Sequence, residues 1–75
     1  MTLSDLNKGE RAKVIKISDP LIEERLLELG VIFGDVVSIY NIAPLRDPII
    51  ISFLKNLIGI RKEEASKIEV EKING

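Results

Sequence analysis

The sequence predicts a mainly β domain, a small antiparallel β-barrel of about five strands with one α-helix inserted near residues 19–29. Three observations lead to this fold class. Short segments rich in β-branched residues recur at close spacing between turn residues. One segment with helical periodicity lies between the first two of them. The chain has 75 residues, which suffice for one domain, residues 1–75.

The first predicted strand spans residues 11–17, where charged and apolar residues alternate imperfectly, as in a half-buried strand with a bulge. The predicted helix follows directly. Asp19 is placed to cap its free N–H groups, and Pro20 fits its first position. Its apolar stripe consists of Ile22, Leu26 and Leu29. Gly30 is suited to end the helix in the left-handed conformation, and Val31 or Ile32 can then pack back on the last turn.

The second half of the chain has strand periodicity. Its predicted elements are strands at 36–42, 49–54 and 57–61, a short helical turn near 62–66 and a last strand around Ile68 and Val70. A loop with two prolines, residues 43–48, precedes a hairpin whose two-residue turn we assign to Lys55 and Asn56. An edge strand as apolar as 49–54 would promote aggregation. We therefore expect the sheet to curl into a barrel, with the helix closing one open end.

The composition excludes several classes of function. The chain has no Cys and no His, which removes thiol and imidazole nucleophiles and the commonest ligands of transition metals. The net charge is −1, and the basic residues Arg11, Lys13 and Lys16 lack the aromatic neighbours typical of nucleic-acid binding. No apolar run is long enough for a signal peptide or a spanning helix. We expect a cytoplasmic protein that is not an enzyme, binds no nucleic acid and does not insert into the membrane.

Acidic residues on the predicted helix are the remaining candidates for chemistry. Glu24 and Glu28 are spaced i, i+4, and Glu23 is adjacent, so a carboxylate pair for acid/base work or ion binding is geometrically feasible. Catalytic carboxylate pairs need a buried environment, which this helix face lacks. We interpret these residues as a solvated acidic face, and we expect no catalytic residue and no cofactor.

Apolar residues on faces that are expected to be exposed to solvent indicate a docking surface. A turn at residues 55–56 pairs Leu54 with Leu57, and Ile50, Leu54 and Leu57 then point outward. A helical projection places Leu27 among acidic residues, away from the apolar stripe. One interpretation is purely structural, because small domains commonly expose leucine. The alternative is a contact surface for a protein partner or for a second copy of the chain.

Several short segments occur in a characteristic order along the chain. They are Leu3 to Leu6 with Gly9, Arg25 to Gly30, Gly34 to Val37, Ala43 to Ile49, Ile60 to Ala65, and Ile68 to Val70. Their order and spacing resemble those of the ferrous iron transport protein A (FeoA) family, and the resemblance spans nearly the whole chain. The resemblance implies an SH3-like barrel, which agrees with the number of strands expected from the sequence.

The resemblance also implies a function. The family assists the FeoB membrane transporter, whose cytosolic part is a GTPase, in ferrous iron uptake, so the chain is expected to act as an adaptor through protein contact. Arg25 and Arg61 match positions that the family usually fills with Arg. They either contact the partner or bridge the helix and the barrel rim to nearby carboxylates. We take Arg25 and Arg61, together with Leu27 and the three hairpin residues, as the predicted partner-binding set.

A different class of function stays open at this point. The same barrel occurs as the carboxy-terminal domain of metal-dependent repressors, so a metal-binding or metal-sensing module is the alternative. Weak ferrous iron contact would then involve Glu23, Glu24, Glu28 or Asp47.

The chain also departs from the family pattern at two places. Family members often carry Gly at the position of Arg46, which implies a differently shaped loop before Asp47. They often carry charged or polar residues at the positions of Ile50 and Leu54, which keeps self-association of this chain as an alternative to a shared family interface.

Overall fold

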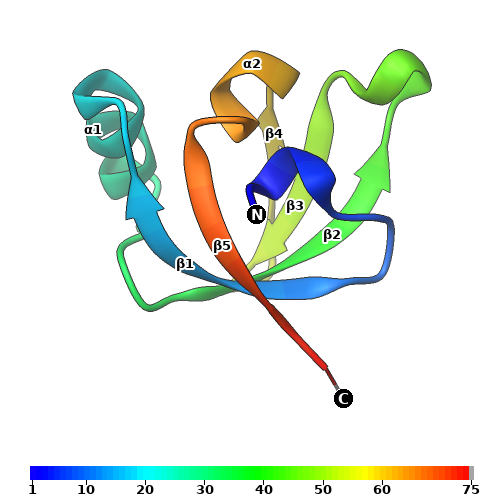
Figure 1. The fold of residues 1–75 in the computed structure, drawn as a ribbon, viewed down its shortest axis with the longest axis horizontal. Coiled ribbons are helices and arrows are strands. Elements are labelled where there is room, and N and C mark those ends of the chain that lie inside the picture. Colours follow the sequence, from blue (N-terminus) through cyan, green and yellow to red (C-terminus); the bar gives the residue numbers. More distant parts are fainter. Residues whose placement is uncertain (75) are drawn as a thin grey trace.

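The chain folds into one five-stranded antiparallel sheet with two short α-helices (Figure 1). The computed structural model describes residues 1–74, so the predicted end of the domain at Gly75 lies outside the described residues. The strands are β1 (Arg11–Ile17), β2 (Val36–Ile42), β3 (Ile49–Phe53), β4 (Asn56–Ile60) and β5 (Ile68–Ile73). The helices are α1 (Pro20–Glu28) and α2 (Lys62–Ala65), and the 3-10 helices are η1 (Leu3–Asp5) and η2 (Pro44–Arg46). The predicted mainly β fold of five antiparallel strands and the inserted helix are confirmed.

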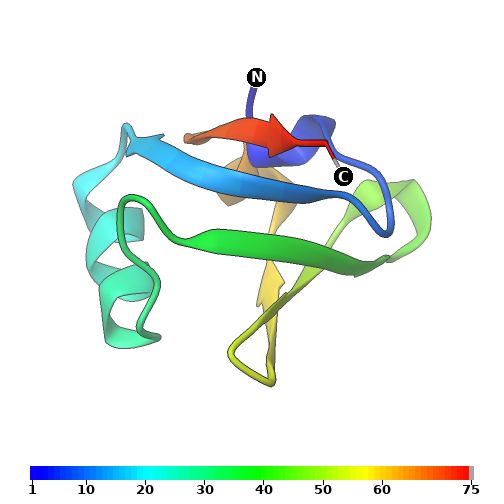
Figure 2. The same ribbon diagram turned by 90° about the horizontal axis from the view of Figure 1, so that it is seen from below.

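The sheet is curved, but it is not closed into a barrel. The strand order is β4-β3-β2-β1-β5, so β4 and β5 are its edges, and no strand pairing joins them within residues 1–74. The chain start covers part of the β5 edge: Thr2 forms a bridge with Glu69, and the Val70 N–H donates to the Met1 carbonyl at 3.0 Å. Figures 1 and 2 show α1 beside the end of β1. The expected closure of the sheet into a barrel is therefore wrong, since no strand pairing joins β4 to β5 within residues 1–74.

Local signals account for α1. The Asp19 carboxylate accepts a hydrogen bond from the Leu21 N–H at 2.9 Å, and Pro20 is the first helical residue. At the other end, Gly30 has a φ of 88°. The Val31 N–H donates to the Leu26 carbonyl at 2.8 Å, and Val31 is buried. Both predicted helix ends are confirmed.

The predicted apolar stripe of α1 is only partly correct. Leu26 is buried and Ile22 packs against the core. Leu29 is 42% exposed, because it is the C-cap residue of the helix and lies beyond its last full turn. The bulge predicted in the first strand is present, since the pairing of β1 with β5 shifts between Val14 and Lys16.

The β3–β4 hairpin has a different turn from the predicted one. Phe53 pairs with Asn56, so Leu54 and Lys55 form the turn, with φ values of 47° and 69°. The predicted pairing of Leu54 with Leu57 is therefore wrong, and Leu57 lies opposite Ser52. Positive φ at both residues is what a type I′ turn requires, and this turn matches the twist of the strands. The partner shift is two residues, so each side chain keeps its predicted face.

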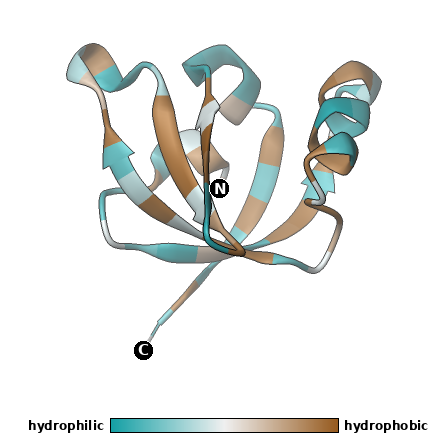
Figure 3. Ribbon diagram, turned by 180° about the vertical axis from the view of Figure 1, so that it is seen from behind, coloured by the Kyte–Doolittle hydropathy of each residue, from teal (hydrophilic) through white to brown (hydrophobic). Residues whose placement is uncertain are grey.

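The core is apolar throughout. Within residues 1–74 no polar or charged residue is buried. Buried and exposed residues alternate along much of each strand, and Figure 3 shows the corresponding bands of hydrophobic and hydrophilic residues. The largest fully buried side chains include those of Leu3, Leu6, Leu26, Ile39, Ile49, Ile51, Ile60 and Ile68. No helix in this part of the chain has the length and hydropathy needed to cross a membrane.

Candidate functional site

An open groove of about 410 Å³ lies between α1 and β1. Three segments line it: residues 14–17 of β1, Glu23 and Leu27 of α1, and residues 31–33 of the loop that joins α1 to β2. Most of these side chains are apolar, and several are exposed to solvent, with Leu27 at 59% and Phe33 at 72%. The groove has the volume of a ligand-binding pocket and an apolar lining suited to a buried contact.

The loop beside the groove is held by hydrogen bonds within the turn 32–35 and between this turn and β1. The Ile32 N–H donates to the Asp35 carboxylate at 2.8 Å, and the Asp35 N–H donates back to the Ile32 carbonyl at 3.1 Å. The Gly34 N–H donates to the Val14 carbonyl, and the Val14 N–H donates to the Asp35 carbonyl, both at 2.8 Å. The turn 32–35 is therefore fastened to β1, and it presents Phe33 to solvent on a fixed backbone.

Arg25 ties α1 to α2 and to the edge of the sheet. Its Nη1 atom lies 2.6 and 2.5 Å from the two carboxylate oxygens of Glu64, and its Nη2 atom donates to the Gly59 carbonyl of β4 at 3.2 Å. The Glu64 carboxylate also accepts a hydrogen bond from the Arg61 N–H at 3.0 Å. The hydrogen bond from Arg25 is the main cause that holds the pKa of Glu64 below its usual value. Arg25 thus makes the bridging contacts that one of its two predicted roles required.

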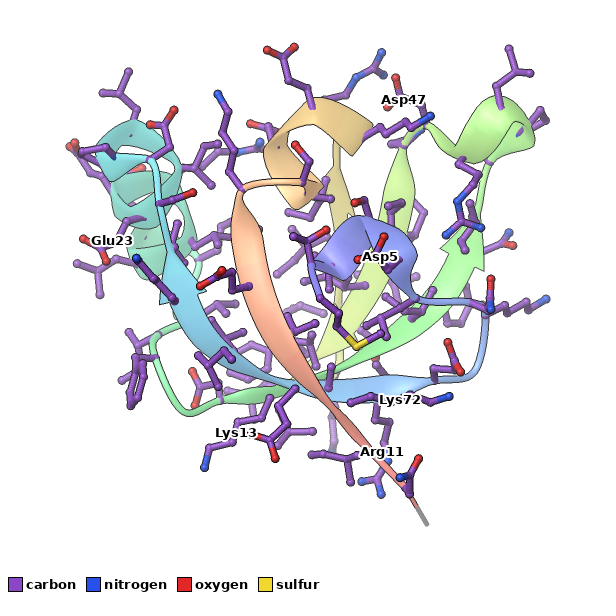
Figure 4. All side chains as sticks on the ribbon, in the orientation of Figure 1. Asp5, Arg11, Lys13, Glu23, Asp47 and Lys72 are labelled. Atoms are coloured by element: carbon purple, nitrogen blue, oxygen red, sulfur yellow. The ribbon has the colours of Figure 1, made fainter. Side chains whose placement is uncertain are left out.

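Arg61 and Asp47 form a second link at the same end of the molecule. Their side chains pair at 3.3 Å, and the Asp47 carboxylate accepts the Lys62 N–H at 3.1 Å, which satisfies one free donor at the start of α2. Figure 4 shows Asp47 near α2 and Glu23 on α1. Among the described residues, no three Asp or Glu side chains are grouped so that they could hold a metal ion.

We expect Glu64→Gln to make the free energy of unfolding less dependent on pH in the acidic range. The folded-state pKa of Glu64 is lowered, so its charged form stabilises the fold above the usual pKa, and this contribution is lost as the pH falls through the lowered value. Between about pH 5 and about pH 3 the wild type should lose more stability than Glu64→Gln. At neutral pH the variant should be about 1 kcal/mol less stable.

Urea unfolding at a series of pH values measures both effects. Glu63→Gln, an exposed neighbour on α2, is the matched control and should follow the wild-type profile. Parallel profiles for the wild type and Glu64→Gln would contradict the assignment of this ion pair.

The predicted hairpin patch does not form one flat cluster. Leu54 is 76% exposed at the turn and Leu57 is 56% exposed on β4. Ile50 is half-buried, and its side chain lies against Gly59. Leu27 belongs to the groove instead. The structure thus divides the predicted apolar residues between two surfaces, the hairpin tip and the groove.

Sequence reasoning identified Leu27 but missed the rest of the groove. Ile15, Ile32 and Phe33 were not among the predicted contact residues, although each is at least 36% exposed. One signal was available, the apolar triplet 31–33 between two glycines. A short loop after a helix can pack only part of such a triplet into the core, and the remainder must face solvent.

Comparison with known proteins relates this geometry to a family. The model of the FeoA domain family matches residues 1–72. A curated relative from Porphyromonas gingivalis, described as an Fe(2+) transport protein A/Fe(2+) transporter FeoB fusion protein, is 35% identical over 75 residues. The match covers 99% of this chain and 9% of the relative, so the chain spans a small part of that protein.

Solved structures agree with the family match. The FeoA protein from Chlorobium tepidum has a TM-score of 0.90 and 36% identity, covering 100% of this chain and 72% of that chain. A FeoA from Stenotrophomonas maltophilia, described as complexed with zinc and as an SH3 domain protein, has a TM-score of 0.81 and 29% identity, covering 95% of this chain and 89% of that chain. The SH3-like fold is thereby confirmed. The chain belongs to the FeoA family, which is involved in ferrous iron transport.

Proposed function

We propose that the chain is an accessory protein of ferrous iron uptake that binds a FeoB-type transporter with a GTPase domain from the cytosolic side. The observation that carries this proposal is the relative in which a FeoA domain and a FeoB transporter form one polypeptide. Fusion gives the two parts a high effective concentration for each other, which is useful only when they act together. This domain would then make the corresponding contact with a FeoB-type transporter.

The exposed apolar side chains support a role in contact. Leu54 and Leu57 at the hairpin tip, and Leu27 and Phe33 at the groove, are all more than half exposed. Exposed apolar patches on small soluble domains commonly mark sites of protein contact. No catalytic step is proposed for this chain.

Binding to the intact transporter in nanodiscs tests the proposal. We expect saturable binding of the chain, and we expect a separate pull-down to retain it on the cytosolic GTPase part and not on the membrane part. Absence of binding to the intact transporter would contradict the proposal. Anaerobic calorimetry with ferrous iron tests the metal-binding alternative, since an affinity tighter than about 10 μM would be hard to reconcile with a pure adaptor lacking His and Cys.

A further inference from the structure

We propose that the groove between α1 and β1 is the docking site for a short segment of the transporter. This segment would carry an apolar anchor, with a basic residue on the side of α1 and an acidic residue on the side of β1. The inference rests on the proposed function, because it takes the FeoB-type transporter as the partner. It adds the surface of the chain and the chemistry of the segment that the surface selects.

The shape of the groove favours it over the hairpin tip. Residues that dominate binding energy usually sit in packed pockets from which water is excluded. The groove is concave, and both Leu27 and Phe33 line it. Leu54, by contrast, lies on a convex turn between two strands. An apolar side chain that enters the groove can therefore be surrounded, whereas contact at the hairpin tip would stay open to solvent.

The groove is also organised before any partner arrives. The hydrogen bonds of the turn 32–35 to its own Asp35 carboxylate and to Val14 fix the backbone on which Phe33 is mounted. On the other wall, Leu27 stands on α1, which Arg25 fastens to Glu64 and to the sheet edge. Binding thus requires little ordering of the chain, which reduces the entropic cost of association.

Charges of opposite sign on the two walls define the chemistry of the segment. Glu23 lines the groove from α1 and Lys16 lines it from β1. Within residues 1–74 neither side chain forms an ion pair, although Lys16 lies opposite Glu69 on β5. Figure 4 shows Glu23 projecting from α1. A peptide with one basic and one acidic residue can pair with both Glu23 and Lys16, and such charge complementarity sets the register and the specificity of binding.

A lipid surface fits these charges less well. The wall contributed by α1 carries Glu23, and Glu24 and Glu28 lie exposed on the same helix. Three exposed carboxylates on the helix that forms one wall of the groove would repel an anionic membrane. We therefore commit to a protein segment and treat a lipid surface and a second copy of the chain as outcomes of the test.

Two pairs of matched variants test the groove with the intact transporter in nanodiscs. Phe33→Ala removes the exposed aromatic residue of the groove, and Tyr40→Ala removes an aromatic residue of β2 that is 55% exposed and does not line the groove. We expect the dissociation constant to rise at least 10-fold for Phe33→Ala and to stay within about twofold for Tyr40→Ala. Both side chains are exposed, so both variants should fold, which circular dichroism checks.

The second pair tests the charge of the α1 wall. Glu23→Lys and Glu24→Lys make the same change at adjacent exposed positions of α1, but only Glu23 lines the groove. Glu23→Lys should weaken binding about 5- to 10-fold at physiological salt, with a smaller effect at high salt, and Glu24→Lys should change it about twofold or less.

Each outcome decides the inference. If Phe33→Ala and Glu23→Lys both bind the transporter with the affinity of the wild type, the groove is not the site, and the proposed function still stands. No binding of the wild type to the transporter overturns both. If the wild type instead self-associates in sedimentation, or binds anionic vesicles, and Phe33→Ala abolishes this, the groove takes a second copy or a lipid surface, and the transporter segment is overturned.

Discussion

Replacing Leu26 with Ala should lower the free energy of unfolding by about 3 kcal/mol. Leu26 is 2% exposed and is the buried residue of α1. Truncation removes its buried methyl groups and leaves a cavity between the helix and the sheet, and both effects destabilise the fold. Urea denaturation monitored by circular dichroism measures the change.

Leu27→Ala is the matched control for this prediction. Leu27 is the next residue of the same helix, but it is 59% exposed at the groove. Its truncation should change stability by about 0.5 kcal/mol or less. A loss below about 1 kcal/mol for Leu26→Ala would mean that α1 is not anchored through this residue.

Arg46→Ala should destabilise the fold by about 2–3 kcal/mol. The Arg46 guanidinium fastens the loop before β3 to the start of the chain: its Nη2 atom donates to the Ser4 carbonyl at 3.0 Å and to the Leu6 carbonyl at 2.5 Å. The variant removes both charge-assisted hydrogen bonds from a part-buried site. Thermal or urea unfolding gives the magnitude.

Arg46→Gly separates the contribution of the Arg46 side chain to stability from that of its backbone conformation. Arg46 has a φ of 61°, in the left-handed region that Gly adopts without strain and Ala does not. Arg46→Gly should therefore be about 1 kcal/mol more stable than Arg46→Ala, but still less stable than the wild type. Equal stability of the two variants would contradict the role assigned to the backbone. The difference would also explain how Gly and Arg can both serve at this position.

Much of the fold follows from local signals in the sequence. Asp19, Pro20 and Gly30 define both ends of α1, and the imperfect alternation in residues 11–17 indicates β1 together with its bulge. These features depend on neighbours along the chain. The mainly β fold with one inserted helix could therefore be predicted without long-range information.

Other features depend on contacts that no local pattern contains. The hairpin turn falls on Leu54 and Lys55, neither of which favours positive φ, because the pairing of β3 with β4 imposes it. The sheet is not closed by strand pairing within residues 1–74; instead, the chain start pairs with the β5 edge, and the Arg25 side chain of α1 donates to a carbonyl of the β4 edge. These contacts join residues far apart in the sequence.

The candidate site was the least predictable part. The groove combines one residue of the expected contact set, Leu27, with Phe33 and Ile15, which lie on two other segments. Only the packing of α1 against β1 brings these residues together. Arg25 and Arg61 make intramolecular ion pairs, and a direct role for them in partner binding remains a prediction.

Residue-resolved nuclear magnetic resonance of the labelled chain, titrated with the intact transporter in nanodiscs, is the most direct measurement. We expect the backbone signals of residues 14–17 and 31–33 and of Leu27 to broaden or shift first, because these residues line the groove. Signals of the hairpin tip, residues 54–57, should follow only later or not at all. A response confined to the hairpin tip, or an unchanged spectrum at saturating transporter, would contradict the assignment of this groove as the contact surface.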